Sequence, residues 1–153
     1  MKEKKDLDQK IEKTVKMLNL IGIPTSGSCE GHIDHGAPAP WVKITPQKEG
    51  KESKRLEKKI SELLEKFYKN RDVAEDARIT IEAANFGFWI HNGDILYKKW
   101  REEVKERVRE ISNGGVAYDI VGEKERDTRT KRLWIYQKEF EDFAIFLEKE
   151  TEN

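Results

Sequence analysis

Two runs of alternating apolar and polar residues, ARITIEA and FGFWIHN, constrain the fold of this chain more than any other feature. A period of two is the pattern of a β-strand that buries one face. Only Ala84 and Asn85 separate the runs, and so short a link favours an antiparallel hairpin. A hairpin is not stable alone in water, so the rest of the chain must supply a hydrophobic layer for its buried face.

Amphipathic helices are the predicted source of that layer. Apolar residues recur at intervals of three or four, the spacing that lines one face of a helix, at 7–18, 56–67, 96–111 and 140–147. Further strands are predicted at 41–45 (WVKIT), 116–121 (VAYDIV) and 132–137 (RLWIYQ), the last two as a second hairpin. The order predicts an α+β fold, a two-layer sandwich in which helices cover one face of a mostly antiparallel sheet of about five to six strands.

Length and charge narrow the class of protein. The 153 residues are the size of one domain, which we expect to span 1–153. Thirty basic and thirty acidic side chains cancel, which argues against a general polyanion-binding protein but leaves room for a local basic patch. One cysteine cannot form an internal disulfide, and no apolar run is long enough to span a membrane. We therefore expect a cytoplasmic protein with no membrane partner.

One face of the predicted sheet is unusually aromatic. Alternation places on it Trp41, Lys43, Arg78, Thr80, Glu82, Trp89, His91, Asp119, Arg132, Trp134 and Tyr136. Trp, Tyr and Arg side chains on a sheet can stack flat rings, including nucleic-acid bases. This pattern gives one hypothesis, a nucleotide or RNA site formed by Trp41, Trp89, His91, Arg132, Trp134 and Tyr136. The alternative is that a helix, the 22–40 loop or a second subunit covers these rings.

A second candidate site lies in the nearly uncharged stretch GIPTSGSCEGHIDHGAPAPWVKI, which holds the only cysteine. Cys29, His32 and His35 follow one another at intervals of three in a Gly- and Pro-rich loop, where three donors can converge on one ion. Thiolate and imidazole suit zinc, which makes these three residues candidate metal ligands. Water or a remote side chain would take the fourth position, as in a catalytic zinc site.

Two other interpretations of the loop remain open. Cys29 could act as a nucleophile that His32 or His91 deprotonates, with Glu30 as a further candidate catalytic base. Alternatively, Cys29 is a small buried residue and His32 bonds the backbone of a stiff loop. The common nucleotide-binding, zincin and hydrolase signatures are absent from the sequence, so none of them decides between these interpretations.

The same stretch resembles a group of small bacterial and phage-type proteins of no assigned activity. They share a helix, then G-[IF]-x-T-x-G-S-C-E-G-H, then a P-W-[VI] strand, with a looser similarity at RLWIYQKEFEDFAIFL. TSGSCEGH is also locally similar to the T-S-S-C-S-G-R stretch of the wybutosine-synthesis methyltransferase family, which acts on tRNA. The chain keeps Thr25, Ser28, Cys29 and Gly31 of that stretch and has His32 in place of its Arg. The second resemblance implies a connection with RNA.

The sequence thus leads to two hypotheses about function. The first is a cytoplasmic domain that binds a metal or small ligand at the Ser26–His35 loop, with metal-assisted or Cys-dependent hydrolysis as the reaction if the protein is an enzyme. The second is a non-catalytic RNA- or nucleotide-binding module that uses the aromatic sheet face.

Overall fold

A computed structural model describes residues 9–33, 39–48, 50–93 and 122–152 of the chain. In order along the chain the elements are α1 (Gln9–Leu20), β1 (Thr25–Cys29), β2 (Trp41–Ile44), α2 (Lys51–Tyr68), a 3-10 turn (Glu75–Ala77), β3 (Ile79–Ala83), β4 (Phe88–Asn92) and α4 (Glu123–Thr151). These ranges therefore contain three α-helices and four strands. The predicted α+β class is confirmed.

The four strands form one antiparallel sheet in the order β1-β2-β4-β3. The predicted hairpin is confirmed as β3 and β4, in which Ile81 lies opposite Ile90. The Ala84 N–H donates to the carbonyl of Gly87 at 3.2 Å and closes the connection between the two strands. β2 lies between β1 and β4, so Trp41 on β2 has one neighbour from each of these strands.

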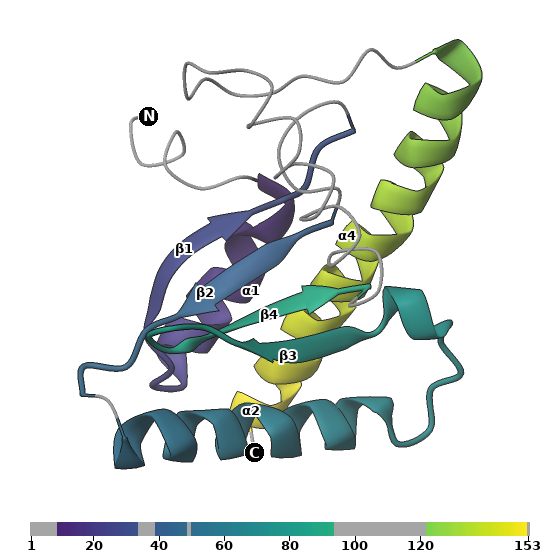
Figure 1. The fold of residues 1–153 in the computed structure, drawn as a ribbon. Coiled ribbons are helices and arrows are strands. Elements are labelled where there is room, and N and C mark those ends of the chain that lie inside the picture. Colours follow the sequence, from purple (N-terminus) through teal and green to yellow (C-terminus); the bar gives the residue numbers. More distant parts are fainter. Residues whose placement is uncertain (1–8, 34–38, 49, 94–121, 153) are drawn as a thin grey trace, which may run out of the picture.

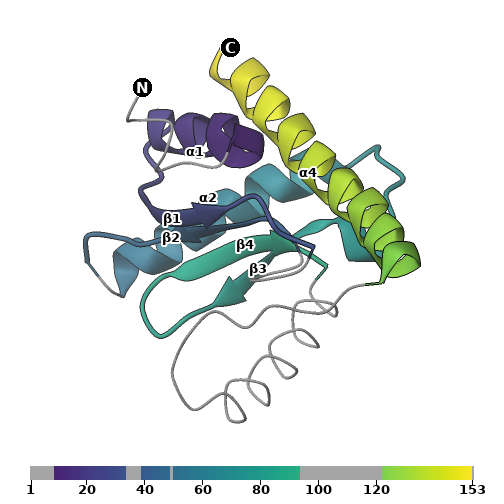
Figure 2. The same cartoon turned by 90° about the horizontal axis from the view of Figure 1, so that it is seen from above.

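The helices cover one face of the sheet, as the sequence predicted. Figure 1 shows α1 and α4 behind the strands, and Figure 2 shows both helices together on the same side of the sheet. A single core joins this face to the three helices, and its buried members include Ile11, Leu18, Val42, Ile44, Leu56, Ile60, Ile90, Phe140, Phe143 and Leu147. None of the helices in the described ranges combines the length and the apolar composition needed to cross a bilayer.

The strand predicted at 132–137 is wrong, because this segment belongs to the 29-residue helix α4. The run Leu-Trp-Ile-Tyr has strong β-propensity, but its burial follows a helix: Tyr136 is buried, whereas Trp134 and Ile135 are exposed. Arg132, Trp134 and Tyr136 therefore do not lie on the aromatic sheet face. The inward positions predicted for the C-terminal helix, Phe140, Phe143, Ala144 and Leu147, are all buried.

β1 was not predicted, because its sequence TSGSC has no apolar alternation. It is an edge strand whose register shifts at Ser26, and its pairing depends on backbone hydrogen bonds to β2 rather than on a hydrophobic face. The predicted helix at 96–111 and the predicted strand at 116–121 lie outside the described residues. The sheet that the structure describes has four strands, fewer than the five to six expected.

A buried polar network ties α2 and β3 to α4. The Tyr68 hydroxyl accepts the Ile79 N–H at 2.7 Å, and both guanidinium nitrogens of Arg71 donate to Glu139, each at 2.8 Å. Arg71 also lies over the Phe67 ring, with its guanidinium carbon 4.2 Å from the ring centroid. Burial and the neighbouring Glu139 carboxylate raise the pKa of Tyr68, and burial and Asp76 raise the pKa of Tyr136.

These two phenols predict an alkaline loss of stability. In the unfolded chain a tyrosine ionises near pH 10, whereas folded Tyr68 and Tyr136 retain their protons to higher pH. The folded state then binds more protons than the unfolded state, so the free energy of unfolding should fall as pH rises above about 10. Urea denaturation from pH 8 to 11 measures the slope. Tyr136→Phe should flatten it, and an unchanged slope in that variant would contradict the assignment.

Candidate functional site

The second face of the sheet, opposite the helices, brings three predicted site residues into one row. Cys29 on β1 lies opposite Trp41 on β2, Trp41 lies opposite His91 on β4, and His91 lies opposite Thr80 on β3. Residues directly opposite in antiparallel strands share a face, so these side chains leave the sheet on the same side. The row therefore places Cys29, where the Cys-Glu-Gly-His segment begins, on the same face as the predicted aromatic residue Trp41 and as His91.

The neighbouring row contributes a second indole and a cation. Lys43 lies opposite Trp89, and Trp89 lies opposite Glu82 on β3. The Lys43 ammonium nitrogen is 4.8 Å from the centroid of the Trp89 ring, a cation–π contact. Gly27 completes this row on β1, where the Trp41 indole lies beside it: a Cβ added at Gly27 would be 3.5 Å from the ring. Both indoles are half-buried.

The same face carries a buried imidazole beside a carboxylate. His91 is fully buried, and its Nε2 lies 3.6 Å from Oε1 of Glu82. Its Nδ1 lies 3.3 Å from the carbonyl oxygen of Asn92, and its own carbonyl accepts the Thr80 hydroxyl at 3.2 Å. Each ring nitrogen of His91 thus lies near an oxygen atom, one of the Glu82 carboxylate and one of the Asn92 backbone.

The loop after β1 is held against α4 by three side chains spaced four residues apart. Arg129 donates to the Ile33 carbonyl at 2.7 Å, and Gln137 donates to the Glu30 carbonyl at 3.0 Å. Between them, Leu133 packs so closely on Gly31 that a Cβ added there would lie 2.6 Å from the leucine Cδ1. Arg129, Leu133 and Gln137, here called the α4 clamp, occupy one face of the helix and fix residues 30–33.

Within this loop the candidate catalytic residues have defined local roles. The Gly31 N–H donates to the Cys29 sulfur at 3.4 Å, so the chain turns around the half-buried thiol. One Glu30 carboxylate oxygen accepts the N–H of Lys10 at 3.3 Å, in the first turn of α1. His32 is half-buried. Catalysis by Cys29, Glu30 and His32 stays a prediction.

The cross-strand row also bears on the hypothesis that His91 deprotonates Cys29. Two strand spacings of about 4.8 Å separate their strands, so their Cα atoms lie about 10 Å apart. Trp41 stands between them in the row. A proton passing directly from the thiol to the imidazole would have to pass the indole, which argues against His91 as the base.

Zinc binding by Cys29, His32 and His35 also stays a prediction. Among the residues that the structure describes, no three His, Cys, Asp or Glu side chains are grouped to hold a metal ion. His35 lies outside those residues, so the complete set of predicted ligands is not placed.

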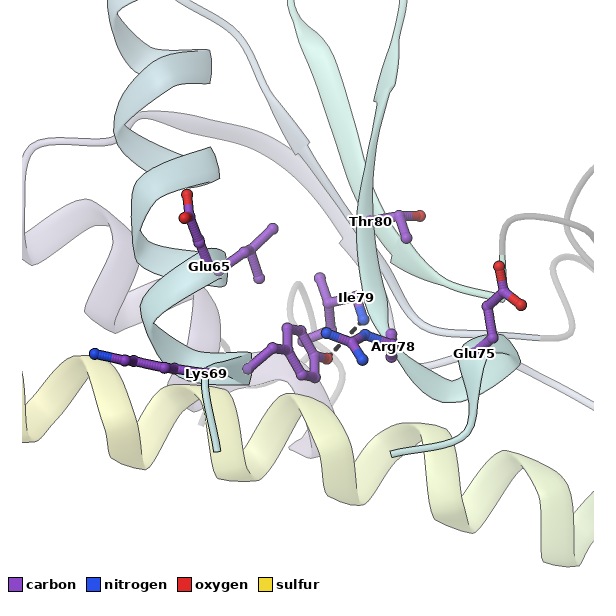
Figure 3. A pocket seen from close by; sticks show the side chains of 8 residues that line it. Glu65, Lys69, Glu75, Arg78, Ile79 and Thr80 are labelled. Carbon is purple, nitrogen blue, oxygen red and sulfur yellow. Dashed lines mark hydrogen bonds between the residues drawn. The ribbon is translucent and has the colours of Figure 1, made fainter. Parts of the chain in front are cut away.

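A separate hollow of about 380 Å³ lies between α2 and β3 (Figure 3). Its lining residues are Leu64, Glu65, Tyr68, Lys69, Glu75, Arg78, Ile79 and Thr80. Arg78, which the sequence assigned to the aromatic face, instead lies over the Tyr68 ring, with its guanidinium carbon 4.3 Å from the ring centroid. The hollow shares Thr80 with the row that contains Trp41, but neither indole lines it.

Compared with known proteins, the sequence matches no family model, and neither the characterised proteins nor the solved structures include a significant match. The fold and the site therefore define the protein only as an α+β domain that carries an aromatic and polar cluster on the face of an antiparallel sheet opposite α1 and α4.

Sequence analysis assigned Lys43 and Glu82 to this face but did not include them among the site residues, although alternation places them beside Trp89. The α4 clamp is not predicted either, because the sequence favours a charged connection between two strands at 122–131. The spacing of Arg129, Leu133 and Gln137 by four is the signal that could have indicated a helix there.

Proposed function

We propose that this protein binds a small planar ligand, a nucleobase or nucleotide, against Trp41 and Trp89 on the second face of the sheet. The observation that carries the proposal is the pair of adjacent cross-strand rows, which place two half-buried indoles and a cation side by side. An indole offers a flat apolar surface for stacking, and base–aromatic stacking tolerates any base.

The polar side chains around the rings suit the rest of such a ligand. Lys43 lies over the Trp89 ring, where its ammonium group would also neutralise a ligand phosphate. Glu82 lies opposite Trp89 and would accept hydrogen bonds from the edge of a base. Buried His91, 3.6 Å from Glu82, would orient that carboxylate rather than contact the ligand.

The loop from Cys29 to Ile33 forms one border of the proposed site. Cys29 lies next to Trp41 across the strand pair, and the α4 clamp holds the following residues in place. Such an arrangement offers a preorganised edge, which reduces the entropy that ligand binding costs. The proposal accommodates the small-ligand hypothesis and the nucleotide hypothesis in one site.

Isothermal titration calorimetry with a panel of nucleosides and nucleoside monophosphates tests the proposal. We expect binding to at least one member, weakened about tenfold or more by Trp41→Leu and by Trp89→Leu because each removes a stacking surface. Lys43→Gln should weaken monophosphates more than the matching nucleosides, since only the former carry the charge that Lys43 neutralises.

Trp134→Leu is the matched control, because it makes the same chemical change at an exposed position on α4. It should leave the affinity of the small ligand unchanged. The proposal fails if no member of the panel binds, or if Trp134→Leu weakens binding as much as Trp41→Leu does. Circular dichroism of each variant checks that the fold is retained.

A further inference from the structure

Helix α4 carries its charges in two opposite blocks. Residues 126–138 contain five Lys or Arg and one acidic residue, whereas residues 139–152 contain six Asp or Glu and one Lys. The net charge of the whole chain is zero, so composition conceals this separation. Figure 1 shows the N-terminal turns of α4 extending beyond the sheet, and the rest of the basic block packs against the fold through only one side of the helix.

Two large apolar side chains lie exposed within the basic block. Trp134 is 59% exposed and Ile135 is 50% exposed, on the side of α4 away from buried Tyr136. Lys131 and Lys138 lie three or four residues before and after both of them, so the two lysines flank the apolar pair on the same helix face. Arg132 is also exposed. Arg132, four residues before Tyr136, lies at the border of this face. The surface formed by Lys131, Trp134, Ile135 and Lys138, with Arg132 at its border, is called the α4 basic surface below.

The contacts within the described residues do not account for these charges. Lys138 lies 3.8 Å from Asp142, a distant and exposed ion pair that contributes little to stability. Lys131 and Arg132 form no ion pair within the described part of the chain. Crowding like charges on one helix face destabilises a helix slightly, and an exposed indole adds no packing energy. The stability of the fold therefore explains neither the cluster of basic side chains nor the exposed Trp134 indole.

We propose that the α4 basic surface binds single-stranded RNA, at a place separate from the small-ligand site on the sheet. Exposed Lys and Arg side chains neutralise backbone phosphates, and Trp134 offers a face on which an unpaired base can stack. Lys131 and Lys138 lie about 10 Å apart along the helix axis, so they would contact different phosphates on either side of the stacked base.

The chemistry of the α4 basic surface favours single-stranded RNA over a second copy of the chain and over a duplex. A second copy packed symmetrically about Trp134 would bring Lys131 of one chain near Lys138 of the other, and those like charges repel. A duplex would satisfy the lysines but leave the indole without an accessible base. Unpaired bases are a regular feature of RNA loops and ends, where aromatic side chains commonly recognise them.

Fluorescence anisotropy with a short labelled oligouridylate, titrated with the full-length protein, tests the proposal. Three phosphate contacts predict a slope of about −2 in a plot of log affinity against log salt concentration, which is a loss of about fifteenfold between about 50 and 200 mM salt. Trp134→Ala should weaken binding about tenfold by removing the stacking surface. Lys131→Gln with Lys138→Gln should reduce the slope to about −0.7.

Matched controls separate this surface from general charge effects. Lys51→Gln with Lys58→Gln removes two exposed lysines at the same seven-residue spacing on α2 and should leave affinity and slope unchanged. Phe86→Ala removes an exposed aromatic ring elsewhere and should also have no effect. Equal weakening by the α2 pair would overturn the proposal, as would the absence of binding at low salt.

Four competing ligands give different results in parallel assays. Duplex RNA or single-stranded DNA bound more tightly than the oligouridylate would overturn the assignment to single-stranded RNA. Sedimentation of the protein with anionic phospholipid vesicles, without RNA binding, would assign the surface to a membrane instead. Self-association that Trp134→Ala abolishes, again without RNA binding, would assign it to a second copy of the chain.

Discussion

Gly31→Ala should lower the free energy of unfolding by about 3 to 4 kcal/mol, in part through backbone strain and in part through a clash with α4. Gly31 has a φ of +89°, which residues with a Cβ rarely adopt. An added Cβ would also lie 2.6 Å from Leu133 Cδ1 and 3.0 Å from the Ala39 carbonyl carbon. Urea denaturation followed by circular dichroism measures the change.

Gly22→Ala separates the two causes. Gly22 also has a φ of +89°, but a Cβ there would meet no atom within 4 Å, so this variant should cost only the strain, about 1 to 2 kcal/mol. Leu133→Ala should recover part of the loss in a double variant with Gly31→Ala, because it removes the nearest clashing atom. Equal costs for Gly22→Ala and Gly31→Ala would mean that the loop does not pack on the α4 clamp as described.

Arg71→Met should also be strongly destabilising, by about 3 kcal/mol, because it leaves the buried Glu139 carboxylate without its bidentate partner. Arg71 makes two 2.8 Å hydrogen bonds to that carboxylate, and Glu139 is itself buried on α4. Removing both charges should cost less than the sum of the single changes, so Arg71→Met with Glu139→Gln should show a coupling energy of about 1 to 2 kcal/mol.

Lys13→Met is the matched control for this network. Lys13 pairs with Glu148 at 3.3 Å, but both side chains are about half exposed, so solvent screens the pair. Its loss should change the free energy of unfolding by about 0.5 kcal/mol or less. If urea denaturation gives Arg71→Met and Lys13→Met similar costs, the buried network does not hold α2 to α4.

The sequence was informative wherever one face of an element had to be buried. The alternation of 79–83 and 88–92 predicted β3 and β4 and the side of each that meets the helices: Ile79, Phe88 and Ile90 are buried in the core. The three- and four-residue periods of α1, α2 and the second half of α4 were equally reliable. The burial of apolar side chains stabilises these helices and strands, and the sequence of each element contains the spacing of those side chains.

The candidate site was predicted in its parts but not in its arrangement. Cys29, Trp41, Trp89 and His91 were each selected from the sequence, yet their common face follows from the strand order, which places β2 between β1 and β4. Strand order depends on pairing between segments far apart in the chain, and the alternation of a single strand contains no record of its neighbours.

Two segments differ most from the structure that the sequence predicts, and tertiary contacts account for both. TSGSC becomes β1 because the backbone of β2 offers it hydrogen bonds, a contribution that leaves no trace in side-chain hydropathy. RLWIYQ is helical because the helical conformation packs Leu133 on Gly31 and buries Tyr136, whose hydroxyl donates to Asp76 at 2.9 Å. Long-range contacts here override a local β-propensity that differs between residues by about 1 kcal/mol or less. The sequence by itself thus determined which faces are apolar, and tertiary contacts determined which backbone conformation presents them.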